Sequence, residues 1–249
     1  MLQAVLFDLD DTLVMADNDA LMNDYFRRLA RLFDGRVEPE RLAKQVMSST
    51  MHTISNPDGK SKTLTIFEQH FFSALNLPVD MSVFMDFYAD EYGELGCWAQ
   101  PRPGAREAVQ TAIDLNLAIV LATNPVFPRI AVNHRLRWAG LDDIEWNLVT
   151  NIENTRYCKP HPQYYTDIAA HIKVAPSACL MVGDDVHYDL PAALTGMRTF
   201  LLSEATTRQD ESTAVLPAYG EEVFTPTYTG QLTDLPSLLH QLAQAKVTR

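Results

Sequence analysis

Short apolar runs recur along the chain, each followed by polar turn residues, and stretches with helical spacing of apolar positions lie between them. The runs predict strands at residues 4–9, 117–122, 147–150, 178–182 and 198–202. The intervening stretches predict helices near residues 104–115, 127–139, 163–172 and 190–195. Strands that alternate with helices favour a parallel sheet covered on both faces. We therefore expect an α/β fold built on a doubly wound parallel sheet.

Between residues 14 and 100 this alternation stops and the pattern becomes helical. It predicts helices at 18–33, 39–51, 64–75 and 81–92, with a polar break at 55–62. One face of the first helix is apolar and predicts packing rather than a ligand site; it carries Leu21, Met22, Tyr25, Phe26, Leu29 and Leu32. We expect a core formed by 1–14 and 101–249, with an α-helical domain inserted at 15–100. Residues 203–222 predict a loop before a closing helix at 235–245.

Composition narrows the class of protein. Hydrophobic residues make up 47% of the 249 positions, which is enough for a sizeable core. The 32 acidic and 20 basic residues give a net charge of -12, which argues against a nucleic-acid polymer or an acidic membrane as partner. The three cysteines form no Cys-x-x-Cys pair, and neither a basic leader nor a long apolar run is found. We expect a soluble, cytoplasmic monomer or homodimer with a small-molecule substrate.

Residues 4–14 read AVLFDLDDTLV, in which an apolar run leads into three carboxylates. Ionised carboxylates repel one another where a strand leaves a core, so Asp8, Asp10 and Asp11 together predict a compensating cation. Asp8 and Asp10 would face the same way if the strand pleat continued, and a hard, oxygen-seeking ion such as Mg2+ would suit them. The plain alternative is an acidic turn in which an aspartate caps the next helix.

Three later segments place polar residues after predicted strands or before a predicted helix. They are LAIVLATNP (117–125, with Thr123 and Asn124), CKPHP (158–162, with Lys159) and CLMVGDDVHYDLPAA (179–193, with Asp184, Asp185 and Asp189). With the Asp8-x-Asp10-x-Thr12 pattern before them, this series resembles the four motifs of the haloacid dehalogenase-like hydrolase superfamily. The helical insertion resembles the cap of its phosphoglycolate phosphatase-like and β-phosphoglucomutase-like branch. The resemblance implies a Rossmann-like core with an α-helical cap.

The resemblance also implies roles for the motif acids. Asp8 would attack phosphorus and form an aspartyl-phosphate, and Asp10 would protonate the leaving alkoxide and then activate water. Mg2+ would be bound by the carboxylates of Asp8 and Asp184 and by the backbone carbonyl of Asp10. Asp185 and Asp189 would orient the metal ligands or the motif lysine, or are simply acids on a loop and a helix start.

The remaining motif residues are expected to handle the phosphoryl group. Thr123 and the backbone around Asn124 would donate hydrogen bonds to phosphate oxygens, and Lys159 would bring a positive charge to the nucleophile. Thr12 is expected to stabilise its turn. The resemblance assigns no function to the neighbouring histidines His161 and His187. Arg27 and Arg28 on the first inserted helix read as exposed charges, although one of them would reach a substrate if the cap closed.

The expected function is a Mg2+-dependent phosphatase acting on a small phosphorylated metabolite. A phosphomutase or a phosphonate hydrolase would use the same aspartyl intermediate and remains open, as does a non-catalytic binding or regulatory protein with this fold. In the dehalogenases of the superfamily halide leaves without a proton, and the second acid of the first motif is typically absent. Asp10 is present here, which favours an ester substrate.

Overall fold

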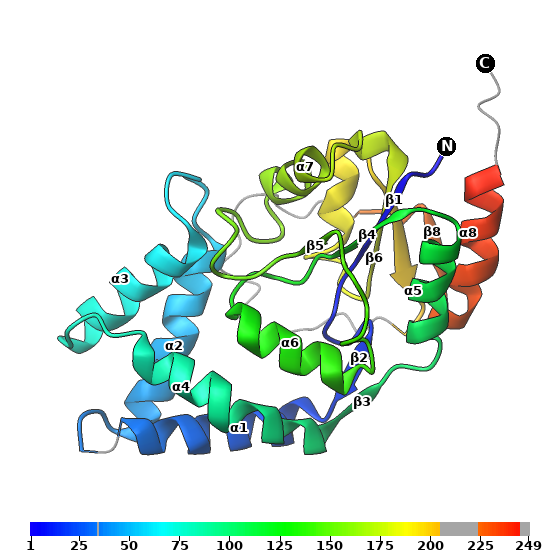
Figure 1. The fold of residues 1–249 in the computed structure, drawn as a ribbon. Helices are drawn as coiled ribbons and strands as arrows, with labels where there is room; N and C mark the ends of the chain where they lie inside the picture. The colour runs from blue at the N-terminus through cyan, green and yellow to red at the C-terminus, as the bar shows by residue number, and fades with distance from the viewer. Residues whose placement is uncertain (34, 205–223, 245–249) are drawn as a thin grey trace.

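A six-stranded parallel sheet lies at the centre of one part of the molecule (Figure 1). The structure is a computed structural model that describes residues 1–33, 35–204 and 224–244. The strand order is β5-β4-β1-β6-β7-β8, and all neighbouring strands are parallel. The strands are Ala4–Phe7 (β1), Ala118–Leu121 (β4), Leu148–Val149 (β5), Cys179–Gly183 (β6), Arg198–Leu202 (β7) and Tyr228–Gly230 (β8). This order confirms the predicted doubly wound α/β fold.

The central strand β1 is buried on both faces. Val5 and Phe7 belong to the hydrophobic core under α5 (Ala105–Asp114), α6 (Arg129–Trp138) and α8 (Leu235–Gln244), whereas Ala4 and Leu6 belong to the core under α7 (Pro162–His171). The exposed fraction of all four β1 side chains is 0%. A strand with two buried faces has no polar alternation, which explains its continuous apolar sequence.

The inserted segment forms four helices that lie to one side of the sheet (Figure 1). They are α1 (Asn18–Leu32), α2 (Pro39–Ile54), α3 (Thr63–Leu75) and α4 (Ser82–Asp90), followed by the 3-10 helix η1 (Tyr92–Trp98). The helices share a separate hydrophobic core that contains Leu21, Tyr25 and Leu29 of α1. The apolar face of α1 therefore packs, as predicted, but Leu21, Met22, Tyr25 and Phe26 of this face also line a cavity between the helices and the core. Asp17 caps α1 by accepting the N–H of Ala20 at 3.1 Å.

The chain crosses between the sheet and the helices through a small antiparallel ribbon that the sequence pattern did not predict. It pairs β2 (Val14–Ala16) with β3 (Ala99–Pro101). At its end the backbone N–H of Asp17 donates to the carbonyl of Trp98 at 2.9 Å. The two covalent connections thus lie side by side and are hydrogen-bonded to each other.

The condition under which Asp8 and Asp10 would face the same way, a continued strand pleat, is not met, because β1 ends at Phe7. The Leu9 carbonyl instead accepts the backbone N–H groups of Thr12, Leu13 and Val14, and Asp11 takes a left-handed conformation with φ of 57°. These contacts make a compact turn directly after Asp8. The turn sends the next carboxylate in another direction.

Other differences are local. The edge strand β8 was not predicted, and 190–195 form a 3-10 helix (η3, Leu190–Thr195) rather than an α-helix. Most of the loop predicted at 203–222, and the last residue of the closing helix, lie outside the described residues. In the part of the chain that the structure describes, no helix is both long and apolar enough to cross a membrane.

Candidate active site

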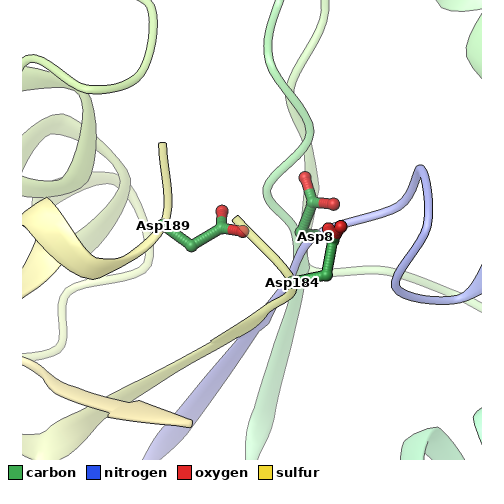
Figure 2. A group of neighbouring side chains, drawn as sticks. All are labelled: Asp8, Asp184 and Asp189. Carbon is green, nitrogen blue, oxygen red and sulfur yellow. The ribbon is translucent and has the colours of Figure 1, made fainter. Parts of the chain in front are cut away.

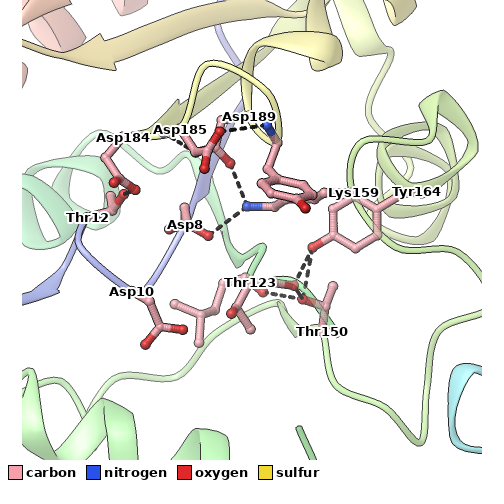
Figure 3. Close-up of polar contacts among 12 residues, drawn as sticks. Asp8, Asp10, Thr12, Thr123, Thr150, Lys159, Tyr164, Asp184, Asp185 and Asp189 are labelled. Carbon is pink, nitrogen blue, oxygen red and sulfur yellow. Dashed lines mark hydrogen bonds and ion pairs between the residues drawn. The ribbon is translucent and has the colours of Figure 1, made fainter. Parts of the chain in front are cut away.

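The carboxyl ends of three neighbouring strands bring the motif residues together. Asp8 follows β1, Thr123 follows β4 and Asp184 follows β6, and β1 pairs with both of the other strands. The backbone N–H of Asp8 continues the pairing by donating to the carbonyl of Val182 at 2.9 Å. Ligands collect at this edge of doubly wound sheets. Figure 3 shows the polar side chains gathered there.

Lys159 lies between two carboxylates in the interior of the site. Its ammonium donates to Asp8 Oδ1 at 2.7 Å and to Asp189 Oδ1 at 2.6 Å, and the residue is only 1% exposed (Figure 3). Burial works against its charge, but the two carboxylates outweigh burial and hold the pKa of Lys159 well above the ordinary value. Lys159 is therefore a cation at neutral pH, and it contacts the predicted nucleophile.

Asp189 reaches Lys159 because Gly183 leaves room for it. A Cβ atom on Gly183 would lie 2.0 Å from Asp189 Oδ2, which is closer than real contacts allow. The same Oδ2 accepts the backbone N–H of Asp185 at 3.0 Å. Both carboxylate oxygens of Asp189 are thus engaged, one by Lys159 and one by the loop after β6.

Asp8, Asp184 and Asp189 form a cluster whose nearest carboxylate oxygens all lie within 4.8 Å of one another (Figure 2). Burial and the neighbouring acids raise the pKa of Asp184 to about 7, and burial also raises the pKa values of Asp8 and Asp189. One lysine does not balance three carboxylates. When all three acids are ionised, two negative charges remain uncompensated, and this set of hard oxygen donors fits a divalent cation of the Mg2+ type.

The carboxylate of Asp10 points away from this cluster (Figure 3). It forms an ion pair with Arg135 of α6, whose Nη1 lies 2.6 Å from Asp10 Oδ2. Arg135 also donates from Nε to the hydroxyl of Tyr92 at 2.7 Å and stacks on Phe127 at 3.7 Å from the ring centroid. Arg135 is buried, whereas 47% of the Asp10 side chain is exposed.

Sequence reasoning missed Arg135. Its partner Asp10 is 125 positions away in the chain. Helix α6 also carries Arg129 and Arg137, and no sequence motif marks Arg135 among the three arginines. In the structure Arg135 is buried, whereas Arg129 and Arg137 are exposed. A usable signal was the placement of Arg135 between the buried residues Val132 and Leu136 on the inward face of the helix.

The loop after β4 is fixed by hydrogen bonds to a backbone carbonyl. The side-chain hydroxyl of Thr123 and the side-chain oxygen of Asn124 are therefore available to a ligand. The Thr123 carbonyl accepts from the Thr150 hydroxyl at 2.7 Å and from the Tyr164 hydroxyl at 2.8 Å (Figure 3). No hydrogen bond from the Thr123 hydroxyl to another described side chain or backbone group is found. Asn124 Oδ1 is buried without a partner among the described residues. A ligand at this loop would meet polar atoms that the fold does not use.

The other motif residues have structural contacts. The Thr12 hydroxyl donates to Asp184 Oδ1 at 3.1 Å, so it supports an acid of the cluster in addition to its turn. Asp185 Oδ1 accepts the backbone N–H groups of His187 and Tyr188, at 2.7 Å and 3.1 Å, and thereby shapes its own loop. The side chain of His161 is hydrogen-bonded to the Ile54 carbonyl at 3.0 Å, which explains that histidine as a link to α2.

Arg27 and Arg28 pair with acids of the helical part. Both contact Asp24, and Arg28 also contacts Glu94. The Arg27 side chain is 62% exposed, which agrees with the predicted exposed charge, whereas the Arg28 side chain is only 15% exposed, so the prediction is wrong for Arg28.

Comparison with known proteins extends this picture. A family model described as haloacid dehalogenase-like hydrolase matches residues 2–195. Hexitol phosphatase B of Escherichia coli K12 is 30% identical over 108 residues, which make up 43% of this chain and 47% of that protein. This chain thus spans about half the length of the curated relatives it matches.

Solved structures share the fold over almost the whole chain. The L-2-haloacid dehalogenase of Xanthobacter autotrophicus with covalently bound chloropropionic acid has a TM-score of 0.58 and 19% identity, covering 96% of this chain and 99% of that chain. A HAD phosphatase from Thermococcus onnurineus has a TM-score of 0.57 and 16% identity, covering 96% and 98%. Since the family model spans most of the sequence, this protein belongs to the haloacid dehalogenase-like hydrolases.

Proposed function

We propose that this hydrolase is a Mg2+-dependent phosphatase that cleaves a small phosphomonoester through an aspartyl-phosphate on Asp8. The observation that carries the proposal is the position of Asp8, between the ammonium of Lys159 and the carboxylate of Asp184 at the strand ends. The partial match to hexitol phosphatase B supports the same reaction class. A phosphomutase or a phosphonate hydrolase would use the same residues, and the products of the reaction distinguish these activities from a phosphatase.

Phosphomonoesters are anionic, so a carboxylate nucleophile needs nearby positive charge to approach phosphorus. Lys159 supplies one such charge and fixes the Asp8 oxygen that it contacts. When bound, Mg2+ would be held by Asp8, Asp184 and the backbone carbonyl of Asp10, and it would neutralise charge on the nucleophile and the ester. Asp189 is not assigned to the ion, because Lys159 and the Asp185 N–H already engage its oxygens.

Asp10 is assigned as the general acid and base. Its carboxylate is partly exposed and lines the cavity between the sheet and the helices, whereas Asp8 lies at the strand ends. The leaving alkoxide would occupy that cavity and take its proton from Asp10. Thr123 and the loop around Asn124 would bind the phosphate oxygens opposite the cluster.

The decisive experiment is substitution of the nucleophile. Asp8→Asn keeps the size and hydrogen-bonding shape of the side chain but removes its nucleophilicity, so phosphate release should fall by many orders of magnitude while the fold persists. Phosphate release from a panel of phosphorylated sugars, alcohols and short acids is measured with and without Mg2+, alongside thermal unfolding.

The matched control is Asp90→Asn, an exposed acid of α4, which should leave turnover unchanged. Asp8→Asn protein that kept more than a few per cent of wild-type activity would refute the aspartyl-phosphate mechanism. Conversion of a substrate to its phosphate isomer, instead of phosphate release, would identify a mutase.

A further inference from the structure

A cavity of about 600 Å³ lies between the helical part and the core, and it includes Asp10 in its wall. Its lining comes from α1 to α4, from the loop after β4 and from α6. A volume of this size is typical of small-molecule sites. Because Asp10 is the proposed acid for the leaving group, the cavity is where the alcohol part of the ester would sit.

The walls are mainly aromatic and aliphatic. They include the rings of Tyr25, Phe26, Phe67, Phe84, Tyr88 and Phe127. The two tyrosine hydroxyls are buried and lie 3.0 Å apart in a hydrogen bond with each other. Most of the surface that an alcohol would contact is therefore apolar, and Asn18, Asn23 and Thr50 are the uncharged polar side chains apart from the tyrosines among the described lining residues.

Charge in the cavity also restricts the alcohol. Among the described residues that line it, Arg135 is the one basic side chain, and its guanidinium is already paired with Asp10. The acids Asp11 and Asp19 line the same cavity. A carboxylate or second phosphate on the alcohol would meet like charge with no cation to balance it.

We propose that the alcohol of the substrate is uncharged and predominantly apolar, such as an aryl-alkyl or medium-chain alkyl alcohol. The inference rests on the proposed phosphatase function and names its substrate class. A polyol would leave several hydroxyl groups against apolar walls, and each stranded hydroxyl lowers affinity on the order of tenfold to a hundredfold. An apolar chain of equal length instead gains from burial.

The first test compares apolar with polar or charged esters, among which hexyl phosphate and the hexitol phosphate have alcohols of the same carbon number. With the full chain and Mg2+, kcat/KM is measured for hexyl phosphate, benzyl phosphate, a hexitol 6-phosphate and phosphoglycolate. We expect the hexyl and benzyl esters to exceed the other two by at least about tenfold, as the stranded polar groups require. A preference for the hexitol phosphate or phosphoglycolate would overturn the inference and leave the phosphatase function intact.

Absence of turnover on all these esters and on p-nitrophenyl phosphate would refute the phosphatase function. Calorimetric titration of the same esters with Mg2+ present then decides the substrate class independently. Tighter binding of hexyl phosphate than of the hexitol phosphate supports the apolar cavity. The reverse order refutes it.

A second test fills the cavity. Met22 of α1 lines it, whereas Met85 of α4 is 37% exposed and does not. Met22→Trp should lower kcat/KM for hexyl phosphate about tenfold but for methyl phosphate less than about threefold, because only the longer chain needs the filled space. Met85→Trp should change neither.

Equal losses for the two esters in Met22→Trp would show that the alcohol lies elsewhere. If Met22→Trp does not fold, Met47→Trp addresses the same cavity from α2. Met47 lines the cavity and is 46% exposed, so a larger side chain is tolerated there. The same difference between hexyl and methyl phosphate is expected.

Discussion

At the scale of single residues, two neighbouring aspartates have opposite surroundings. Asp8 is buried beside Lys159, whereas Asp10 faces the cavity and Arg135. This separation supports the proposed roles, in which Asp8 attacks phosphorus and Asp10 protonates the leaving group. General acid catalysis matters most when the leaving group is a strong base.

Asp10→Asn should therefore slow alkyl phosphates on the order of 10²–10⁴-fold, because an alkoxide needs a proton to depart. The first phosphoryl transfer from p-nitrophenyl phosphate should slow much less, since nitrophenolate leaves unprotonated. The measurement is the pre-steady-state burst of alcohol or nitrophenolate release, which is separate from hydrolysis of the intermediate. Equal burst losses for both esters, or release of halide from short 2-halo acids by the wild type, would contradict this assignment.

Arg135 should act as a positioning residue through Asp10. Arg135→Met removes the ion pair that fixes the acid, so it should reproduce the leaving-group signature of Asp10→Asn, with a larger loss for alkyl than for aryl esters. Arg135→Lys keeps a charge and should restore part of the loss. Arg137→Met, at an exposed position of the same helix, is the control. A fall in thermal stability with equal losses for both esters would mean that Arg135 only supports the fold.

At the scale of elements, the sequence predicts best those strands that are buried on both faces. β1, β4 and β6 are buried in the middle of the sheet and read as continuous apolar runs. The edge strand β8 has the sequence Tyr-Thr-Gly and carries no such signal. The ribbon of β2 and β3 joins segments far apart in the chain, and a local pattern does not contain that pairing.

The same reasoning separates the parts of the candidate site. Residues that end a predicted strand, such as Asp8 and Asp184, are placed by the topology rule for parallel sheets. Arg135 and Tyr92 approach Asp10 through tertiary packing of α6 against η1, which no motif describes. The direction of Asp10 depends on a turn whose left-handed Asp11 is equally invisible in the sequence.

The helical part has its own aromatic core, and this predicts independent local stability. Phe71 is fully buried and packs on Phe33, Phe67, Phe72 and Phe84 of the inserted segment. Phe71→Ala should lower the free energy of unfolding of this part by about 3–5 kcal/mol. Hydrogen exchange should accelerate in α1, α3 and α4 while β1, β4 and β6 stay protected.

Val79→Ala is the control for Phe71→Ala, because Val79 is 64% exposed. Its effect should remain within about 0.5 kcal/mol. Equal acceleration of exchange in the helices and in the sheet would show that the two parts unfold as one unit. That outcome would refute the inserted segment as a separate domain.

At the scale of the whole molecule, stability should depend on pH and Mg2+ through the acid cluster. Asp184 has a folded-state pKa of about 7, above the ordinary value for an aspartate, because of burial and nearby acids. Between pH 4 and 7 the Asp184 carboxyl is therefore mostly ionised in the unfolded chain but mostly protonated in the folded chain. Without Mg2+, the contribution of Asp184 to the free energy of unfolding should fall as pH rises through that window.

The measured quantity is the difference between wild type and Asp184→Asn in chelator-treated protein. Burial lowers the pKa of His161, so this histidine makes the folded state more stable as pH rises, opposite to Asp184. Both proteins contain His161, so its effect cancels when the free energy of unfolding of Asp184→Asn is subtracted from that of the wild type. Mg2+ binds the ionised carboxylate, so its affinity for the wild type should rise about tenfold from pH 6 to pH 8. Calorimetric titration at the two pH values measures that change. Equal Mg2+ affinity at pH 6 and pH 8, with a pH-independent stability difference, would place the ion away from Asp184.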